Sequence, residues 1–343
     1  MDALTAEADL RLEGFGITTV YVGGGTPSLL PATFWEAFLG RIASLADPGD
    51  PSEVTMEVNP GTAGPGYMKT LKRAGFDRLS LGMQSLHDDV LLTLGRIHDS
   101  GRAADCFRQA REAGFDNISV DLIYGVPGQT PESWEDDLSA VIELGPEHVS
   151  CYELTLEEGT KMWRRFPEWR DGCGDGFDGM YFIAHELLTD AGYVHYEVSN
   201  YAACGERKSV HNRRYWRRLP YVGLGPSAHS FDGVFRRTWN TASVNEYVGL
   251  LKSGRSPEAG GESLTAFQAA LEIVMLGLRN DGGFDMKELP SGTGCRIDEA
   301  YLEFMADAGR VTVSGSRIMP TALGMLFADG DAAALLSFSG FDR

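Results

Sequence analysis

The feature that most constrains the fold is an alternation of short apolar runs with longer helical patterns over the first two thirds of the chain. This alternation predicts a parallel sheet whose strands are joined by helical crossovers. Several of the runs read as nearly continuous apolar segments, which is typical of strands covered on both faces. The predicted strands are Thr18–Val22, Val54–Val58, Arg78–Leu81, Asn117–Leu122, His148–Leu154 and His195–Val198. The predicted helices between them include Thr33–Ala46, Gly101–Ala113, Pro131–Glu143 and Gly176–Ala191.

A barrel fits this alternation better than a dinucleotide-binding fold. The glycines at 23–25 do not form a GxGxxG pattern, and no acidic residue follows a second strand at the required place. We therefore predict an α/β fold with a partial (β/α) barrel over residues 1–240. From residue 241 to 343 a small C-terminal domain is expected. Its helical pattern at Leu264–Leu278, the segment Tyr301–Ala308 and the strand pair Val311–Val313 and Arg317–Met319 predict a winged-helix-like α+β arrangement.

Charge and composition exclude several classes of partner. The formal net charge of -19 argues against nucleic acid and against an anionic membrane surface. The apolar runs are too short to span a bilayer, and the acidic N-terminus lacks the features of a signal peptide. We expect no stable membrane insertion and a cytoplasmic location.

The cysteines predict neither a disulfide framework nor a local metal site. There are five of them, an odd number that is typical of reduced thiols in an intracellular protein. No CxxC or CxxxC spacing occurs in the sequence. Buried apolar positions are the expected role for those that fall in helix or strand patterns.

Polar or glycine-rich segments follow four consecutive predicted strands. They begin at Gly23, Glu57, Gly82 and Asp121. In parallel α/β folds the chemistry is located at the carboxyl ends of the strands. The four segments are therefore expected to form one ligand site.

The glycines and the two acids suggest what this site binds. Gly24 and Gly25 let a ligand approach the backbone closely, and Thr26 adds a hydroxyl. Glu57 and Asp121 are acids at the ends of apolar strands, where a carboxylate needs a partner. Together they favour a ligand that carries a ribose and an amine. A simple tight turn for the glycines, and salt bridges for the acids, remain open as alternatives.

Two further polar residues fit the same ligand. Gln84 offers both a donor and an acceptor to a small polar group. Arg96 can bind a carboxylate in a bidentate manner. The alternatives are a solvated arginine at a helix end, or a salt bridge between the acids and Arg78 or Arg96.

A second candidate site lies in the segment HNRRYW. His211 is one helical turn from Tyr215 and close to Trp216, so that an imidazole stands beside aromatic rings. This combination suits a flat macrocycle with an axial iron ligand. His229 is a second candidate ligand. A packed aromatic corner, and a structural hydrogen bond for the loop histidine, are the alternatives.

Eight ordered motifs along nearly the whole chain resemble a known family. They are GGGTPS, EVNPGT, SLGMQS, LGRIH, DLIYGVPGQT, YEVSNYA, HNRRYW and GLGPSAHSF. These motifs resemble those of the HemW heme chaperones, which belong to the radical S-adenosylmethionine group beside oxygen-independent coproporphyrinogen III oxidase. HNRRYW resembles the chaperone branch in particular.

The resemblance implies cofactors and residues. It implies that S-adenosylmethionine contacts Gly24, Gly25, Thr26, Glu57, Gln84, Arg96 and Asp121. It implies heme bound with the help of His211, Tyr215 and Trp216, and an unidentified acceptor protein that receives the heme. It also implies a [4Fe-4S] cluster.

One departure from the family is large. The family opens with a strand and a CxxxCxxC loop that ligates the cluster, and this sequence holds no such motif. Met1–Glu13 is expected to be the first barrel helix, so the strand at Thr18 matches the family's second strand. We expect the first strand and the cluster ligands to be absent, and no radical catalysis from the chain as written. Three readings stay open: a heme chaperone whose sequence starts late, a cluster-less heme-binding protein, or a coproporphyrinogen oxidase that decarboxylates by radical chemistry.

Overall fold

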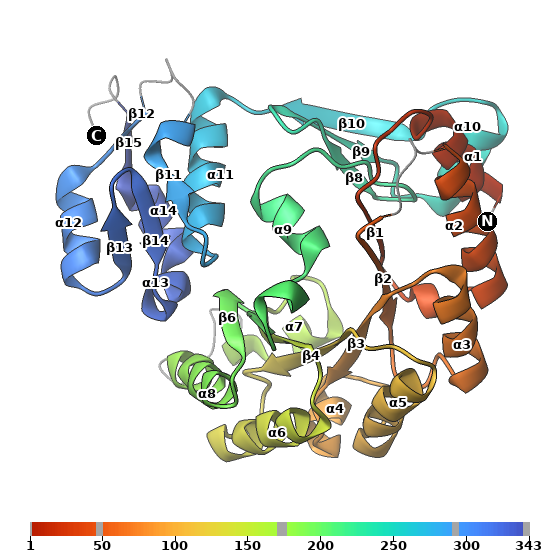
Figure 1. Ribbon diagram of the computed structural model, residues 1–343, viewed down its shortest axis with the longest axis horizontal. Coiled ribbons are helices and arrows are strands. Elements are labelled where there is room, and N and C mark those ends of the chain that lie inside the picture. Colours follow the sequence, from red (N-terminus) through yellow and green to blue (C-terminus); the bar gives the residue numbers. More distant parts are fainter. Residues whose placement is uncertain (1, 46–50, 170–176, 290–294, 339–343) are drawn as a thin grey trace. The chain divides into compact units, whose positions relative to one another are not determined.

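The computed structural model describes residues 2–45, 51–169, 177–289 and 295–338 (Figure 1). The predicted helix ends Met1, Ala46 and Gly176, and Cys173, lie outside these residues. The chain forms two compact units. We call Thr19–Leu39 with Pro51–Lys208 the sheet unit, and Met1–Thr18, Gly40–Asp50 and Ser209–Arg343 the terminal unit. The domain boundary expected after residue 240 stays a prediction.

A seven-stranded sheet forms the centre of the sheet unit. Its strand order is β1-β2-β3-β4-β5-β7-β6. The first five strands are parallel, and β7 pairs antiparallel with both β5 and β6. This confirms the α/β class and the partial barrel. The strands are β1 (Thr19–Val22), β2 (Glu53–Val58), β3 (Arg78–Gln84), β4 (Ile118–Tyr124), β5 (His148–Glu153), β6 (Val194–Glu197) and β7 (Asn200–Ala202).

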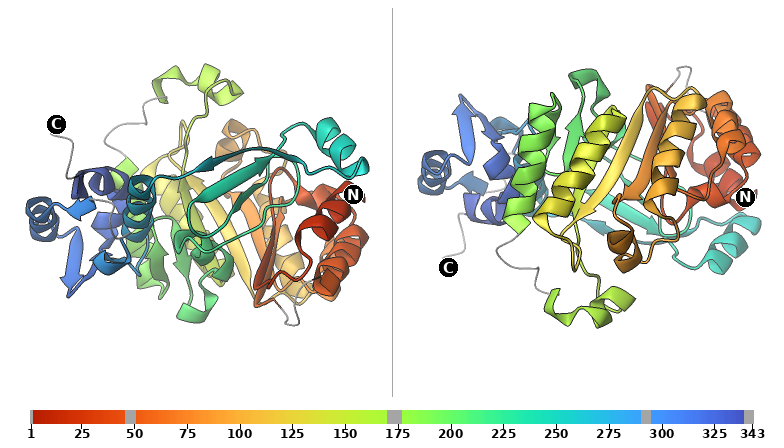
Figure 2. Two further views of the ribbon diagram at one scale, coloured as in Figure 1. Left: turned by 90° about the horizontal axis from the view of Figure 1, so that it is seen from above. Right: turned by 90° about the horizontal axis from the view of Figure 1, so that it is seen from below.

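Helices cover one face of this sheet. α3, α5, α6 and α8 lie side by side along it (Figure 1; Figure 2, right). Their starts carry local signals, such as the Thr130 capping box of α6 and the Asp99 cap of α5. The helices of this unit are η1 (Pro27–Leu29), α2 (Ala32–Leu45, shared with the terminal unit), α3 (Pro65–Ala74), α4 (Asp88–Thr93), α5 (Ser100–Glu112), α6 (Pro131–Leu144), α7 (Lys161–Arg165), η2 (Pro167–Trp169), α8 (Phe177–Asp190) and η4 (Gly205–Arg207).

The two faces of the sheet differ in polarity, which corrects the expectation of strands apolar on both faces. Successive side chains of a strand point to opposite faces. One face holds buried apolar side chains, including Met56, Leu79, Leu81, Val120 and Leu122. The alternate positions hold buried polar side chains, which we call the polar row: Thr55, Arg78, Ser80, Ser119, His148 and Ser150. Register places these residues on neighbouring strands, so they can only bond one another or a ligand.

A buried carboxylate organises the first part of the terminal unit. Glu7 of α1 (Asp2–Arg11) is 0% exposed. It accepts hydrogen bonds from the Gly225 N–H at 2.7 Å, Asn240 Nδ2 at 2.7 Å and the Tyr247 hydroxyl at 2.6 Å, and from Arg11 at 3.2 Å. The elements it joins include a three-stranded antiparallel sheet in the order β10-β9-β8. The strands and further helices of this part of the unit are β8 (His229–Phe231), β9 (Arg236–Asn240), β10 (Glu258–Ser263), α9 (Val210–Trp216) and α10 (Val244–Lys252).

The C-terminal part has its own apolar core, built around Val274, Leu278, Phe284 and Ile318. A small antiparallel sheet in the order β11-β14-β13 accompanies its helices, which agrees with the expected winged-helix-like α+β arrangement. No helix in the described ranges is long and apolar enough to cross a membrane. The elements are α11 (Ala266–Leu278), β11 (Phe284–Asp285), η5 (Met286–Glu288), β12 (Cys295–Ile297), α12 (Glu299–Asp307), β13 (Val311–Ser314), β14 (Arg317–Pro320), α13 (Ala322–Leu326), α14 (Ala328–Leu335) and β15 (Leu336–Phe338).

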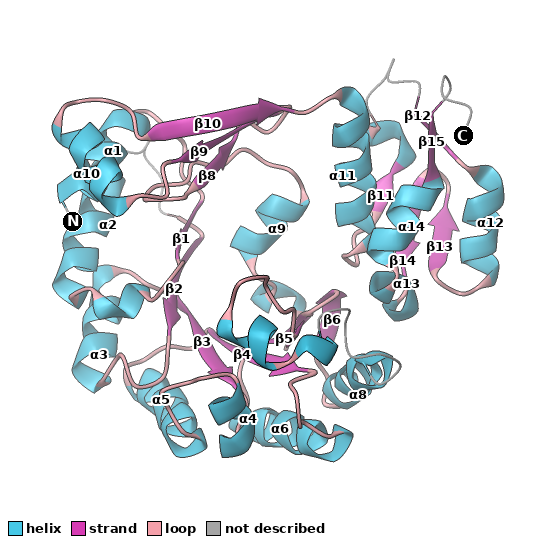
Figure 3. Cartoon of the chain, turned by 180° about the vertical axis from the view of Figure 1, so that it is seen from behind, coloured by secondary structure: helices cyan, strands magenta, loops and turns pink. Residues whose placement is uncertain are grey.

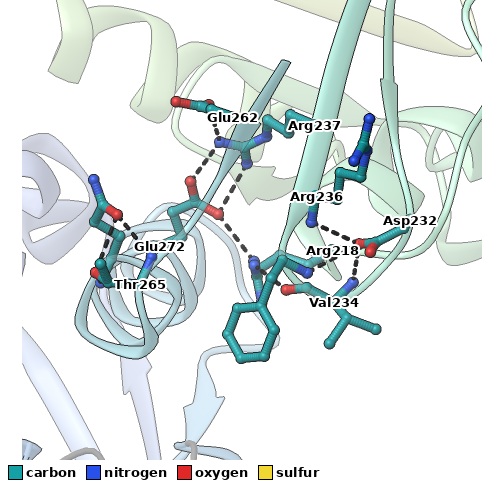
Figure 4. A network of polar contacts seen from close by, with 10 residues as sticks. Arg218, Asp232, Val234, Arg236, Arg237, Glu262, Thr265 and Glu272 are labelled. Carbon is teal, nitrogen blue, oxygen red and sulfur yellow. Dashed lines mark hydrogen bonds and ion pairs between the residues drawn. The ribbon is translucent and has the colours of Figure 1, made fainter.

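A carboxylate between two arginines joins α11 to the β8–β10 sheet (Figure 4). Glu272 of α11 accepts two bonds from Arg237 of β9, at 2.6 and 2.9 Å, and one from Arg218 Nε at 3.0 Å. Both guanidinium groups also lie over the Phe231 ring, at 5.1 Å and 5.2 Å. The Glu272 side chain is 17% exposed, so this carboxylate separates two enclosed cations.

Glu272→Gln should therefore destabilise the protein, because it removes the carboxylate between the two arginines and leaves Arg237 only its longer ion pair with Glu262, at 3.7 Å. We expect the free energy of unfolding to fall by about 2 kcal/mol. Urea denaturation of the variant and the parent measures this. The matched control is Glu258→Gln, whose pair with Arg236 is exposed (40% and 64%). Its expected cost is under about 0.5 kcal/mol, and equal costs for the two variants would contradict the prediction.

Candidate functional site

Glu57 and the glycine turn after β1 form one hydrogen-bonded structure. The Tyr21 hydroxyl donates to Glu57 Oε1 at 2.8 Å, and the Gly24 N–H donates to Oε2 at 3.1 Å. Burial and the nearby Glu57 charge raise the pKa of Tyr21, so its hydroxyl stays protonated as a donor. The side chain of Glu57 is thereby fixed at the end of β2.

The three positions of the turn require glycine for different structural reasons. A Cβ at residue 23 would lie 2.7 Å from Glu57 Oε1 and 2.7 Å from the Tyr21 ring, so only glycine fits there. Gly24 and Gly25 have open space but φ values of +84° and +63°, which favour glycine. The tight turn and the ligand site, which the sequence left as alternatives, are therefore the same segment.

Asn59, which the sequence reasoning did not select, connects three strand ends. Its Nδ2 donates to Thr26 Oγ1 at 3.3 Å, which ties the loop after β2 to the loop after β1. Its Oδ1 lies 3.0 Å from the position that a Cβ of residue 82 would take. Because Gly82 at the end of β3 has no Cβ, it leaves room for the side-chain amide of Asn59.

Gln84 is a buried residue with a strained backbone conformation. It has φ +70°, a value that a residue with a long side chain rarely adopts, and it follows an irregularity in the β3–β4 register. The residue is 8% exposed, and its side-chain nitrogen lies 2.7 Å from the position that a Cβ of residue 82 would take, so the glycine at 82 leaves room for it. Backbone strain at a buried residue of a strand end points to a ligand contact.

Asp121 is held by two serines of the polar row. Ser80 Oγ donates to Oδ2 at 2.7 Å and Ser119 Oγ donates to Oδ1 at 3.2 Å. Burial raises the pKa of Asp121, while the Ser80 bond and the Arg78 charge lower it. No ion pair among the described residues joins Asp121 or Glu57 to Arg78 or Arg96, so the salt-bridge alternative for the acids does not describe this structure.

Arg96 lies in the loop after α4. Its Nε is fully enclosed and has no partner among the described residues. Burial lowers the pKa of this guanidinium, which nonetheless stays charged at neutral pH. His98 of the same loop is buried, and its Nε2 is 3.2 Å from the Met83 carbonyl oxygen, which ties this loop to the end of β3. The Arg96 guanidinium, whose Nε is enclosed and has no partner, is suited to bind an anionic group.

Four of the predicted residues lie on, or directly after, the adjoining strands β1 to β4 (Figure 3). Gly24 follows β1, and Glu57 and Gln84 lie at the carboxyl ends of β2 and β3, whereas Asp121 lies inside β4, which continues to Tyr124 and not, as expected, only to Leu122. Their roles toward a ligand stay predictions. The supporting residues Tyr21, Asn59, Ser80 and Ser119 were missed, although the alternation of polar and apolar residues within the strands was a signal for most of them.

The HNRRYW residues lie on α9 of the terminal unit. His211 Nε2 is 3.1 Å from the Tyr215 hydroxyl, and their rings are perpendicular with centroids 4.9 Å apart. Tyr215 also contacts the Tyr221 ring at 4.7 Å. Trp216 ends the same helix. His229 is exposed, with its ring 5.9 Å from that of Trp239. The half-buried His211 and the exposed Tyr215 on α9 remain a candidate pair for a macrocycle.

The described cysteines do not assemble a metal site. Cys106 and Cys151 are buried, as expected for small apolar residues, and burial raises the pKa of the Cys106 thiol to about 12. Cys204 and Cys295 are also free thiols. No group of three potential metal ligands occurs within the described ranges.

Comparison with known proteins identifies the family. Residues 1–141 match the radical SAM superfamily. The heme chaperone HemW of Mycobacterium tuberculosis is 36% identical over 339 residues, which cover 97% of this chain and 85% of the relative. HemW of Bacillus subtilis is 32% identical and covers 97% of this chain and 87% of the relative. The chain belongs to the HemW family.

A solved structure shows the same fold. Coproporphyrinogen III oxidase (HemN) from Escherichia coli, a radical SAM enzyme, matches with a TM-score of 0.76 at 23% identity. The match covers 97% of this chain and 81% of HemN. The HemW family and HemN therefore share the α/β fold described above, and the resemblance inferred from the eight motifs is confirmed.

Gly23→Ala tests the geometry of the turn in this HemW relative. The added methyl group must displace Glu57 and Tyr21, so we expect a loss of stability of about 1–3 kcal/mol. The control is Gly66→Ala in α3, where nothing lies within 4 Å of the new Cβ and φ is not positive. That change should be neutral or stabilising. Thermal denaturation compares the two, and a Gly23→Ala protein as stable as the parent would show that the turn is loose.

Proposed function

We propose that this protein is a heme chaperone of the radical SAM type, which binds S-adenosylmethionine at the ends of β1–β4 and heme at α9. The observation that carries the first part is Gln84, a buried residue at the end of β3 whose backbone is held at φ +70°. The names of the HemW relatives support the second part.

The donor set at the strand ends fits S-adenosylmethionine. The ligand carries an ammonium group, a carboxylate, a sulfonium and ribose hydroxyls. Glu57 and Asp121 offer anionic acceptors for hydroxyl or ammonium groups, and Arg96 offers an unpaired cation for the carboxylate. Gln84 supplies an amide, and Gly24, Gly25 and Thr26 supply a turn that allows close approach. In the enzymes of this superfamily, S-adenosylmethionine would supply a radical when one electron reduces its sulfonium, because the C–S bond then breaks to methionine and a 5′-deoxyadenosyl radical.

The described residues do not fit an iron–sulfur cluster. A [4Fe-4S] centre requires closely spaced thiolates, and the described cysteines do not gather into such a set. We derive no step through a cluster from this chain. The proposal therefore concerns binding of the two organic ligands.

Heme binding is proposed through the exposed face of α9. His211 offers an imidazole, and Tyr215 beside it offers a ring for stacking. Because the hydroxyl of Tyr215 lies within hydrogen-bond distance of His211 Nε2, the tyrosine orients the imidazole that would face the iron. Trp216 completes the aromatic segment.

The partner that receives the heme is proposed to be a protein of unidentified nature. The net charge of -19 disfavours nucleic acid as that partner. We place the protein in the cytoplasm on the same sequence grounds as above.

Gln84→Ala should weaken binding of S-adenosylmethionine about tenfold, because it removes an amide that the ligand satisfies. Isothermal titration of the parent and the variant measures the affinity. The control is Gln109→Ala on helix α5, which lies away from the strand ends and should bind like the parent. If the Gln84 variant binds as tightly as the parent, the proposed ligand site is wrong.

His211→Ala should reduce heme binding, because it removes the proposed axial ligand. Titration with hemin, followed at the Soret band, is expected to show a shifted band and weaker binding. His229→Ala is the comparison, since His229 is the other candidate histidine and is exposed. A changed spectrum only in the His229 variant would move the heme site from α9 to that loop.

A further inference from the structure

A continuous chain of four hydrogen-bonded side chains runs behind Asp121 in the sheet unit. Ser119 Oγ is 3.2 Å from Asp121 Oδ1 and 2.8 Å from His148 Nδ1. His148 Nε2 is 2.7 Å from the Tyr196 hydroxyl. Ser119 and His148 are 0% exposed and Tyr196 is 1% exposed. The chain reaches the proposed ligand site through Asp121.

The number of available protons fixes which side chain is the donor in each hydrogen bond of this chain. The Ser119 hydroxyl has a single proton, and an ionised Asp121 can only accept it. The bond between Ser119 and His148 must then use a proton on His148 Nδ1. With Nδ1 protonated on a neutral ring, Nε2 is an acceptor, and the Tyr196 hydroxyl is its donor. Each residue therefore donates to the next one: Tyr196 donates to His148, His148 donates to Ser119, and Ser119 donates to Asp121.

The opposite direction requires a different charge state. If His148 carries its proton on Nε2, the Ser119 proton turns to His148 Nδ1. Ser119 then presents only lone pairs to Asp121, and the contact is favourable only when Asp121 is itself protonated. The tautomer of His148 and the ionisation of Asp121 are thus coupled through one serine.

The surroundings favour a neutral imidazole. Burial and the Arg78 charge lower the pKa of His148 well below its ordinary value. Burial raises the pKa of Asp121, while the bond from Ser80 and the charge of Arg78, which is 2% exposed in the same polar row, act in the opposite direction. The Lys208 ammonium lies 5.5 Å from the centroid of the Tyr196 ring and places a further cation at the far end of the chain.

We propose that His148 is a positioning residue for the ligand site, and that its Nδ1–H tautomer holds Ser119 as a donor to the Asp121 carboxylate. With Ser119 on Oδ1 and Ser80 on Oδ2, both oxygens of the carboxylate are held in place before a ligand arrives. A carboxylate held in this way suits two neighbouring hydroxyl groups, as on a ribose. The inference rests on the proposed binding of S-adenosylmethionine for its consequence, but the tautomer is a property of the protein alone.

The tautomer is measured without any ligand. In protein labelled with ¹⁵N-histidine, the imidazole nitrogen shifts distinguish protonated from bare nitrogens. The His148 signals are those lost in His148→Asn or His148→Gln. We expect a protonated Nδ1 and a bare Nε2 at neutral pH. A protonated Nε2 with a bare Nδ1, or an imidazolium, would overturn the proposal.

Ligand affinity tests the consequence with two matched variants. The side-chain nitrogen of His148→Asn takes the place of Nδ1 and still donates to Ser119, whereas His148→Leu has a similar size and no donor. Both lose the bond to Tyr196, so a purely structural role predicts equal effects. We expect the Leu variant to bind S-adenosylmethionine about tenfold more weakly than the Asn variant, and equal affinities would refute the positioning role.

The two proposals fail in different ways. If the parent protein does not bind S-adenosylmethionine, the proposed function is wrong, and the imidazole nitrogen shifts still decide the tautomer. If the parent binds and His148 carries its proton on Nε2, the function stands and the role of His148 is wrong.

Discussion

The structure depends on a sheet with one apolar face and one polar face. Side chains such as Leu79 and Val120 are fully buried, and each contributes on the order of 1.5–3 kcal/mol when removed from water. The alternate residues of the same strands are polar and also buried, so each needs a hydrogen-bond partner or a ligand. Ser80 and Ser119 meet this need by binding Asp121. The apolar face therefore holds the strands together, and the polar row supplies the site.

The site at the strand ends combines fixed groups with unsatisfied ones. Glu57 is held by Tyr21 and Gly24, so its position is set before any ligand arrives. Arg96 instead keeps an enclosed Nε without a partner among the described residues, and Gln84 is buried in a strained backbone conformation. The backbone strain at Gln84 costs roughly 1–3 kcal/mol, which the packing of β3 between β2 and β4 must offset. A preorganised ligand site requires both kinds of group: some held in place by the protein, and others left free to bind the ligand.

The terminal unit uses buried carboxylates for a different purpose. Glu7 collects donors from α10 and from the loop before β8, and Glu272 separates two arginines beside α11. Neither residue belongs to a predicted ligand site. Both join segments that are far apart in sequence, over separations of 240 and 35 residues for Tyr247–Glu7 and Arg237–Glu272. Acidic residues in this protein therefore serve as structural connectors as well as candidate ligand contacts.

The sequence alone predicted the alternation of strands and helices over the first two thirds of the chain, the segments that carry the candidate site, and the family. It could do so because these depend on local periodicity and on short motifs such as GGGTPS and SLGMQS. Strand β7, a three-residue antiparallel insertion, was not predicted because so short a run has no measurable period. Only the tertiary structure decided which polar residues share a face and bond one another. His148 lies 27 residues after Asp121 in the sequence, and only the register of β4 against β5 brings it to Ser119 and so to that carboxylate.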